Sequence, residues 1–84
     1  MMLNKVQTPA DALVYITDCT LATVVDMAMK KSRPRGEYER QKCIAQKAID
    51  WMDAMGVDYS GSRATQVKEE GSVNLWAAHY EVPK

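Results

Sequence analysis

A proline–glycine break near the middle of the chain constrains the fold more than any other feature. Residues 32–36, Ser-Arg-Pro-Arg-Gly, separate two stretches in which apolar residues recur at three- and four-residue spacings. Pro34 biases the residue before it away from the helical region, and Gly36 can adopt left-handed backbone angles that close a turn. A five-residue connection between two long helices predicts an antiparallel helical hairpin.

The first stretch predicts a helix over about residues 9–31. Thr8 supplies a hydroxyl at the N-cap position, and Pro9 occupies the first helical position, where a missing N–H is tolerated. Apolar residues then repeat with helical spacing from Leu13 onwards. One alternative stays open, because residues 13–17 are rich in β-prone side chains and could form a strand before a shorter helix.

The second stretch predicts a helix over about residues 37–55. Gly56 stands where a left-handed glycine commonly ends a helix, and Trp51 is expected in the core. The helix carries a broad apolar stripe, formed by Tyr38, Ile44, Ala45, Ala48, Ile49, Trp51, Met52 and Met55.

The last third of the chain predicts a change to β-structure. Residues 63–68 and 73–82 have the composition of two strands around a turn at residues 69–72. Strict alternation runs through Trp76, Ala78, Tyr80 and Val82. The sequence therefore predicts an α+β fold in a single domain of residues 1–84: a two-helix hairpin followed by a short β-hairpin or extended tail over about residues 62–82.

The composition is that of a globular protein rather than a disordered or membrane-spanning one. Hydrophobic residues make up 46% of the 84 residues, charged residues make up 26%, and no apolar run approaches the roughly 20 residues that cross a bilayer. Residues 1–5 lack the pattern of a signal peptide, so we expect a cytoplasmic protein. Cys19 and Cys43 have no neighbours at metal-ligand spacing. Because neither a disulfide nor a metal site is predicted to stabilise so small a core, we expect a homo-oligomer.

Side chains that carry catalysis are sparse. The single histidine, His79, has no serine, cysteine or paired acids at motif spacing, and isolated glycines form no phosphate-binding loop. Asp11, Asp18 and Asp26 lie along one face of the first predicted helix, where we expect a solvated acidic surface rather than a metal site. The sequence therefore predicts a protein that is not an enzyme and has no cofactor or metal.

The charge is unevenly distributed, although the formal net charge is zero. Residues 30–47 contain seven basic and two acidic residues, a local charge of +5. An anion site or acidic-partner site is predicted there, at a group that we call the basic tip: Lys30, Lys31, Arg33, Arg35 and Arg40. A solvated basic loop is the alternative. Trp76 and Tyr80 complete the candidate binding residues, either as core or, at a sheet edge, as a patch that contacts a partner.

The turn and second helix resemble a known family in the segment Ser32-Arg33-Pro34-Arg35-Gly36-Glu37 and in the later Ala48 and Trp51. The similarity is to the helical-hairpin domain of phage proteins that sequester the cyclic-nucleotide signals of bacterial immunity, the anti-CBASS and anti-Thoeris sponges. In that family a proline and an Arg-Glu pair open the second helix, and an alanine and a tryptophan follow. The resemblance implies an oligomer that binds a cyclic nucleotide. More broadly, the chain resembles small phage accessory proteins.

Three functions are compatible with these features. The leading hypothesis is a small, phage-encoded binding protein that docks on a host protein and inhibits or redirects it. The first alternative is an oligomeric sponge that sequesters a cyclic-nucleotide immune signal. The second alternative is a small nucleic-acid-binding protein that uses the basic tip.

Overall fold

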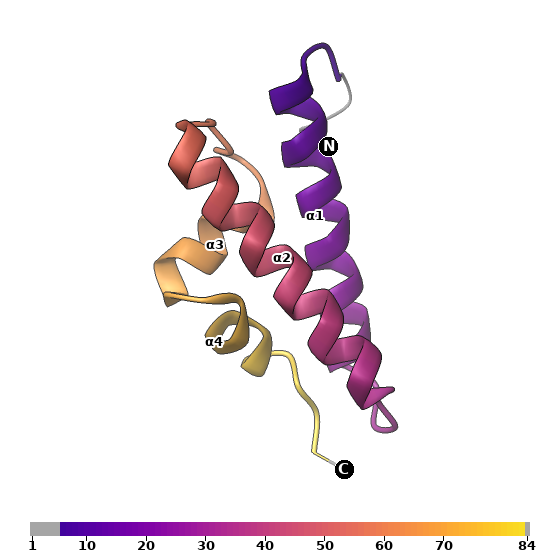
Figure 1. The fold of residues 1–84 in the computed structure, drawn as a ribbon. Coiled ribbons are helices and arrows are strands. Elements are labelled where there is room, and N and C mark those ends of the chain that lie inside the picture. The colour runs from indigo at the N-terminus through magenta and orange to yellow at the C-terminus, as the bar shows by residue number, and fades with distance from the viewer. Residues whose placement is uncertain (1–5, 84) are drawn as a thin grey trace.

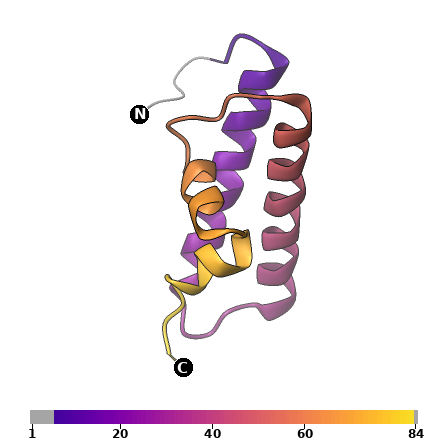
Figure 2. The same cartoon turned by 90° about the vertical axis from the view of Figure 1, so that its left-hand side faces the viewer.

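The computed structural model describes residues 6–83, so the expectation about residues 1–5 lies outside the described chain. The described residues form four helices: α1 (Pro9–Ala28), α2 (Arg35–Met55), α3 (Arg63–Glu70) and α4 (Val73–Ala78). α1 and α2 run antiparallel as a long hairpin (Figure 1). α3 and α4 lie across one side of that hairpin, as the turned view in Figure 2 shows.

α1 begins where the sequence predicts. The Thr8 hydroxyl accepts a hydrogen bond from the backbone N–H of Asp11 at 3.1 Å, and Pro9 fills the first helical position. The helix is continuous through residues 13–17, so the strand alternative for that segment is wrong. It ends at Ala28, earlier than expected, where the backbone turns into the connection to α2.

α2 is bounded by a proline and a glycine. Pro34 is its N-cap residue, so Gly36 lies inside the first helical turn rather than in the connection. Gly56 follows the helix with φ of 69°, a left-handed conformation that favours glycine. The glycine that matters for the backbone is therefore the one after the helix.

One core joins all four helices. The hairpin contributes side chains that recur at helical spacing and are almost fully buried: Val14, Leu21, Val24, Ala28, Tyr38, Ala45, Ile49 and Met52. The two short helices contribute Ala64, Val67, Val73, Trp76 and Ala77. The short helices thus cover a seam that α1 and α2 leave between them.

The prediction of a C-terminal β-hairpin is wrong, and with it the α+β class, because residues 6–83 contain helices and no strand. The alternating pattern through Trp76 competes with a second pattern in the same segment. Val73, Trp76 and Ala77 recur at helical spacing, and all three are buried. The helices α3 and α4 bury these side chains against the α1–α2 hairpin, whereas a lone two-stranded hairpin is marginal in water.

Side chains of the hairpin cap both short helices. Asp18 of α1 accepts from the backbone N–H of Arg63 at 2.8 Å and pairs with the Arg63 guanidinium at 2.7 Å. Gln46 of α2 accepts a hydrogen bond from the backbone N–H of Val73 at 2.8 Å. Ser72, the N-cap residue of α4, adds a local cap, because its hydroxyl accepts from the backbone N–H of Leu75. Helices this short are unstable alone, so these caps fix their places on the hairpin. The expectation that Asp18 belongs to a solvated acidic surface is wrong, since Asp18 is only 6% exposed.

Candidate functional site

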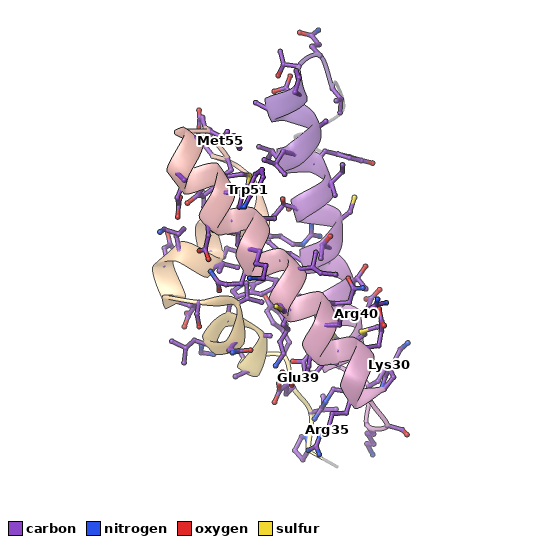
Figure 3. The ribbon with its side chains drawn as sticks, in the orientation of Figure 1. Lys30, Arg35, Glu39, Arg40, Trp51 and Met55 are labelled. Atoms are coloured by element: carbon purple, nitrogen blue, oxygen red, sulfur yellow. The ribbon has the colours of Figure 1, made fainter. Side chains whose placement is uncertain are left out.

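The structure places the basic tip at the end of the hairpin where the chain passes from α1 to α2 (Figure 3). Lys30, Lys31 and Arg35 are exposed there. Arg33 is held by the protein itself, because its guanidinium donates to the carbonyl oxygens of Ala28 at 2.7 Å and Lys30 at 3.1 Å. The Ala28 carbonyl is at the end of α1, where the helix leaves acceptors unpaired, and the Lys30 carbonyl follows in the connection.

Acidic side chains surround the cations of the tip. Arg40 forms an ion pair with Glu37 at 2.8 Å. A hydrogen bond from Gln41, followed by one from Arg40, holds the pKa of Glu37 below its ordinary value. The cavity beside the tip is lined by Arg33, Arg35, Tyr38, Glu39 and Glu81. An incoming anion would meet two carboxylates in that cavity, which weakens it as an anion site.

The segment after α4 closes this end of the molecule. The Tyr38 hydroxyl donates to the Glu81 carboxylate at 2.6 Å, and the N–H of Val82 donates to the carbonyl of Ala28 at 3.3 Å. Burial first, and then the bond to Glu81, raises the pKa of Tyr38 above its ordinary value. The Tyr38 hydroxyl is therefore a neutral donor committed to the protein's own chain.

Trp76 and Tyr80 are brought together, but as part of the core rather than as an open patch. Their rings meet edge to face with centroids 5.3 Å apart. Trp76 is 3% exposed, and its indole N–H donates to Gln66 at 3.1 Å. Tyr80 is half-buried beside it. Trp76 is thus too covered to touch a partner without unfolding of α4.

An apolar stripe on α2 is exposed instead. It is formed by Ile44, Ala48, Trp51 and Met55, at successive spacings of four, three and four residues. Trp51 is 67% exposed and Met55 is 56% exposed, so the expectation that Trp51 lies in the core is wrong. Figure 3 shows both side chains toward the C-terminal end of α2, away from the basic tip. This spacing is the heptad pattern by which one helix packs along another.

α1 extends the same apolar surface. Leu13 is half-buried at its edge, and Ile16 is 60% exposed one turn further along. A shallow cavity between the two helices is lined by Leu13, Lys47, Ala48 and Trp51. We define the hairpin face as the six apolar residues of this surface: Leu13, Ile16, Ile44, Ala48, Trp51 and Met55.

The hairpin face lies on the side of the hairpin that the short helices leave uncovered. Gln46 is turned toward α4, and Trp51, five residues later, points about 140° away from it on an ideal helix. Asp18 is turned toward α3, and Leu13, five residues earlier, points about 140° away in turn. Leu13 and Trp51 line the same shallow cavity at the seam between the helices. One side of the α1–α2 seam is therefore covered by α3 and α4, and the other is exposed.

Two threonines continue the α1 part of this surface at the same spacing. The Thr20 hydroxyl donates to the carbonyl of Ile16 at 3.0 Å, and the Thr23 hydroxyl donates to the carbonyl of Cys19 at 3.1 Å. Because each hydroxyl proton is already bound within the helix, covering these residues with another surface would leave no hydroxyl donor unpaired. The α1 side is thus compatible with an apolar contact.

The other reactive side chains are scattered. His79 meets Glu70 at 2.9 Å on the exposed surface of α3 and α4. Cys19 and Cys43 are unpaired and exposed, rather than partly buried as such thiols usually are. Between residues 6 and 83, no cluster of three metal-binding side chains is found, and Asp18 is bound to Arg63 instead.

The sequence predicts Trp51 in the core and groups it with Ile44 and Met55 in one apolar stripe, because periodicity alone cannot separate a buried stripe from an exposed one. A signal was nevertheless present. The apolar stripe of α2 is wide enough for two neighbouring surfaces, one through Ile49 and one through Trp51. A helix that packs on one side only needs the first.

Comparison of the chain with protein-family models, with curated proteins and with solved structures finds no match. Within the described residues, no helix is both long and apolar enough to cross a membrane.

Proposed function

We propose that the protein is a non-enzymatic binding protein that docks on another protein through the hairpin face. The observation that carries this proposal is Trp51, 67% exposed within a heptad-spaced apolar stripe, in a chain that buries its other tryptophan. Tryptophan is among the residues that contribute most when an interface covers them. In the setting that the sequence predicts, a phage-encoded chain in the host cytoplasm, such docking inhibits or redirects a host protein.

The arrangement of the face supports protein binding. Its apolar side chains come from two neighbouring helices, and Leu13, Ala48 and Trp51 line one cavity between them. Exposed apolar side chains that gather in this way mark interaction sites more often than scattered ones do. Lys47 borders the patch beside Trp51 and supplies a polar edge. An apolar centre with a polar rim is the usual anatomy of a protein–protein interface.

The basic tip gives less support to the two alternatives. The guanidinium of Arg33 is bound to the end of α1, and that of Arg40 is bound to Glu37. Glu39 and Glu81 line the neighbouring cavity. A cyclic-nucleotide sponge or a nucleic-acid-binding protein would need those cations for phosphate, so we rank both functions below protein docking.

The test combines capture with titration. Tagged protein captures binding partners from a bacterial lysate, and each purified partner is titrated calorimetrically against wild type and variants. We expect Trp51→Asp to weaken binding by about tenfold or more, because a buried charge replaces a central aromatic contact. Leu75→Asp is the matched control, since Leu75 is 57% exposed but lies on α4, away from the face. It should bind as wild type does.

Two outcomes would overturn the proposal. Equal affinity of wild type and Trp51→Asp for every captured protein would remove the hairpin face as the site. Binding that survives Trp51→Asp but is lost when Lys31 and Arg35 are replaced by alanine would move the site to the basic tip. In that case binding of nucleotide or nucleic acid, measured in the same titrations, decides between the alternatives.

A further inference from the structure

We propose that, while no other protein is bound, the hairpin face is covered by a second copy of this chain, packed antiparallel so that two hairpins form a four-helix bundle. This inference rests on the proposed function, because a second copy would use the same face and give way to the docking partner. The face presents two antiparallel helices of similar length, α1 with 20 residues and α2 with 21. Its natural complement is another antiparallel pair, as in bundles built from helical hairpins.

The stripe on α2 matches itself when reversed. Its spacings of four, three and four residues are symmetric about a point between Ala48 and Trp51. A two-fold axis through that point places Ile44 against the partner's Met55 and Ala48 against the partner's Trp51. A small residue then meets a large one, which is the complementarity that interdigitating helices need. A same-direction pairing would instead stack the two tryptophans and the two alanines on each other.

Charge selects the same orientation. Residues 30–47 carry a net charge of +5, whereas residues 48–62 contain three acidic residues, Asp50, Asp53 and Asp58, and no basic ones. The antiparallel register brings Lys47 within one turn of the partner's Asp50. It also keeps the two basic tips at opposite ends of the dimer. A same-direction pairing would bring the tips together at the cost of like-charge repulsion.

The size of the face sets the strength of the dimer. The stripe from Ile44 to Met55 is about 16 Å long at 1.5 Å per residue, and the molecule is 23 Å across in its second dimension. The contact is therefore smaller than the roughly 800 Å² per partner of a standard interface. We expect a reversible, concentration-dependent dimer rather than a permanent one.

The experiment measures mass as a function of concentration. Sedimentation equilibrium from about 1 µM to about 1 mM spans the range of weak association. The average mass of the wild-type protein should rise with concentration from 9.4 kDa toward twice that value. Trp51→Glu on α2 and, independently, Ile16→Glu on α1 should each raise the dissociation constant by about tenfold or more. Leu75→Glu, with the same change on α4, should dimerise as wild type does.

Orientation is read by cross-linking in a Cys19→Ser, Cys43→Ser background. A mixture of Ile44→Cys and Met55→Cys chains should form a disulfide between the two variants, because the antiparallel register brings these positions together. Ile44→Cys alone should not cross-link. Efficient cross-linking of Ile44→Cys to itself would overturn the antiparallel arrangement.

Failure of this inference is distinguishable from failure of the proposed function. Wild type that stays at 9.4 kDa across the whole range rejects the second copy as occupant. The proposed function would then still be decided by the titrations with Trp51→Asp. A dimer unaffected by both Trp51→Glu and Ile16→Glu, with circular dichroism showing folded variants, rejects the hairpin face as the dimer contact.

Discussion

The α1–α2 hairpin and the α3–α4 segment are held in place by different kinds of interaction. Within the hairpin, Leu21, Ile49 and Met52 have no exposed surface. Their contribution to stability depends on the apolar area that they bury and not on the direction of a bond. The short helices also bury apolar residues, but their starts are fixed by single polar atoms on Asp18 and Gln46. The hairpin is therefore the scaffold, and the short helices are attached to it at named points.

This comparison explains why one side of the hairpin remains free. α3 and α4 are capped only from the side that carries Asp18 and Gln46. On ideal helices both capping side chains point away from Leu13 and Trp51. The apolar surface on that side belongs to the scaffold, yet the chain's own short helices do not cover it.

The largest effect is expected for a charge in the scaffold. Ile49→Asp places a carboxylate where the native side chain has no exposed surface, at a cost of about 4 kcal/mol or more. We expect it to abolish the folded state, as judged by circular dichroism and urea unfolding. Asp26→Ala, at an exposed position of α1, should stay within about 0.5 kcal/mol of wild type. Equal stability of both variants would contradict the assignment of the scaffold core.

The next effect is expected at the cap of α3. Asp18→Ala removes the acceptor of the Arg63 N–H and one partner of an ion pair, at a cost of about 2 kcal/mol. Hydrogen exchange should show α3 losing protection while α1 and α2 keep it. If protection fell equally in all four helices, the short helices would be part of the scaffold and the comparison would fail.

A smaller effect is expected at the cap of α4. Gln46→Ala removes the bond to the Val73 N–H, but the Ser72 hydroxyl still caps the same helix. We expect a loss of about 1 kcal/mol in the free energy of unfolding. Gln46→Glu keeps a side-chain acceptor for the Val73 N–H, so its free energy of unfolding should be close to that of wild type. A loss as large as that of Asp18→Ala would show that the two caps are equivalent.

The hairpin was predictable because its signals are local. Thr8 and Pro9 begin α1, and Gly56 ends α2, within a few residues of the ends that they define. The short helices were not predictable in the same way. Asp18 lies 45 positions from the N–H that it caps, and Gln46 lies 27 positions from its own. Without those partners in view, the alternation through Trp76 favoured strands.

The candidate site was less accessible to sequence reasoning than the fold. A cluster of cations predicts a basic tip, but nothing in the sequence shows that the Arg33 guanidinium is bound to the end of α1. Likewise, apolar periodicity includes Trp51 and Ile49 in one stripe, although one is exposed and the other buried. Only the directions from which α1 and α4 pack on α2 separate them, and those directions are set by contacts between segments that are distant in the sequence.

The smallest effect on stability is expected from pH, at the hydrogen bonds that Asp53 of α2 accepts from Tyr59 and Lys68. Hydrogen bonds first from Tyr59 and then from Lys68 lower the pKa of Asp53 below its ordinary value of 3.8. Stabilisation by this carboxylate is therefore complete above that value and is lost as pH falls through the lowered pKa. Asp53→Asn should be less stable than wild type at pH 7, and urea unfolding should show the difference shrinking in acid. A difference that is constant with pH would contradict this sign.

The central claim is that the hairpin face is a binding surface, and Trp51 reports on it directly. The spectrum of Trp51→Phe, subtracted from that of wild type, isolates the emission of this tryptophan from that of the buried Trp76. In dilute protein we expect emission typical of an indole in water. As concentration rises, the emission should shift to shorter wavelength and become protected from acrylamide. The account would be contradicted if the Trp51 emission kept the wavelength of an indole in water at every protein concentration and also with each captured partner at saturation.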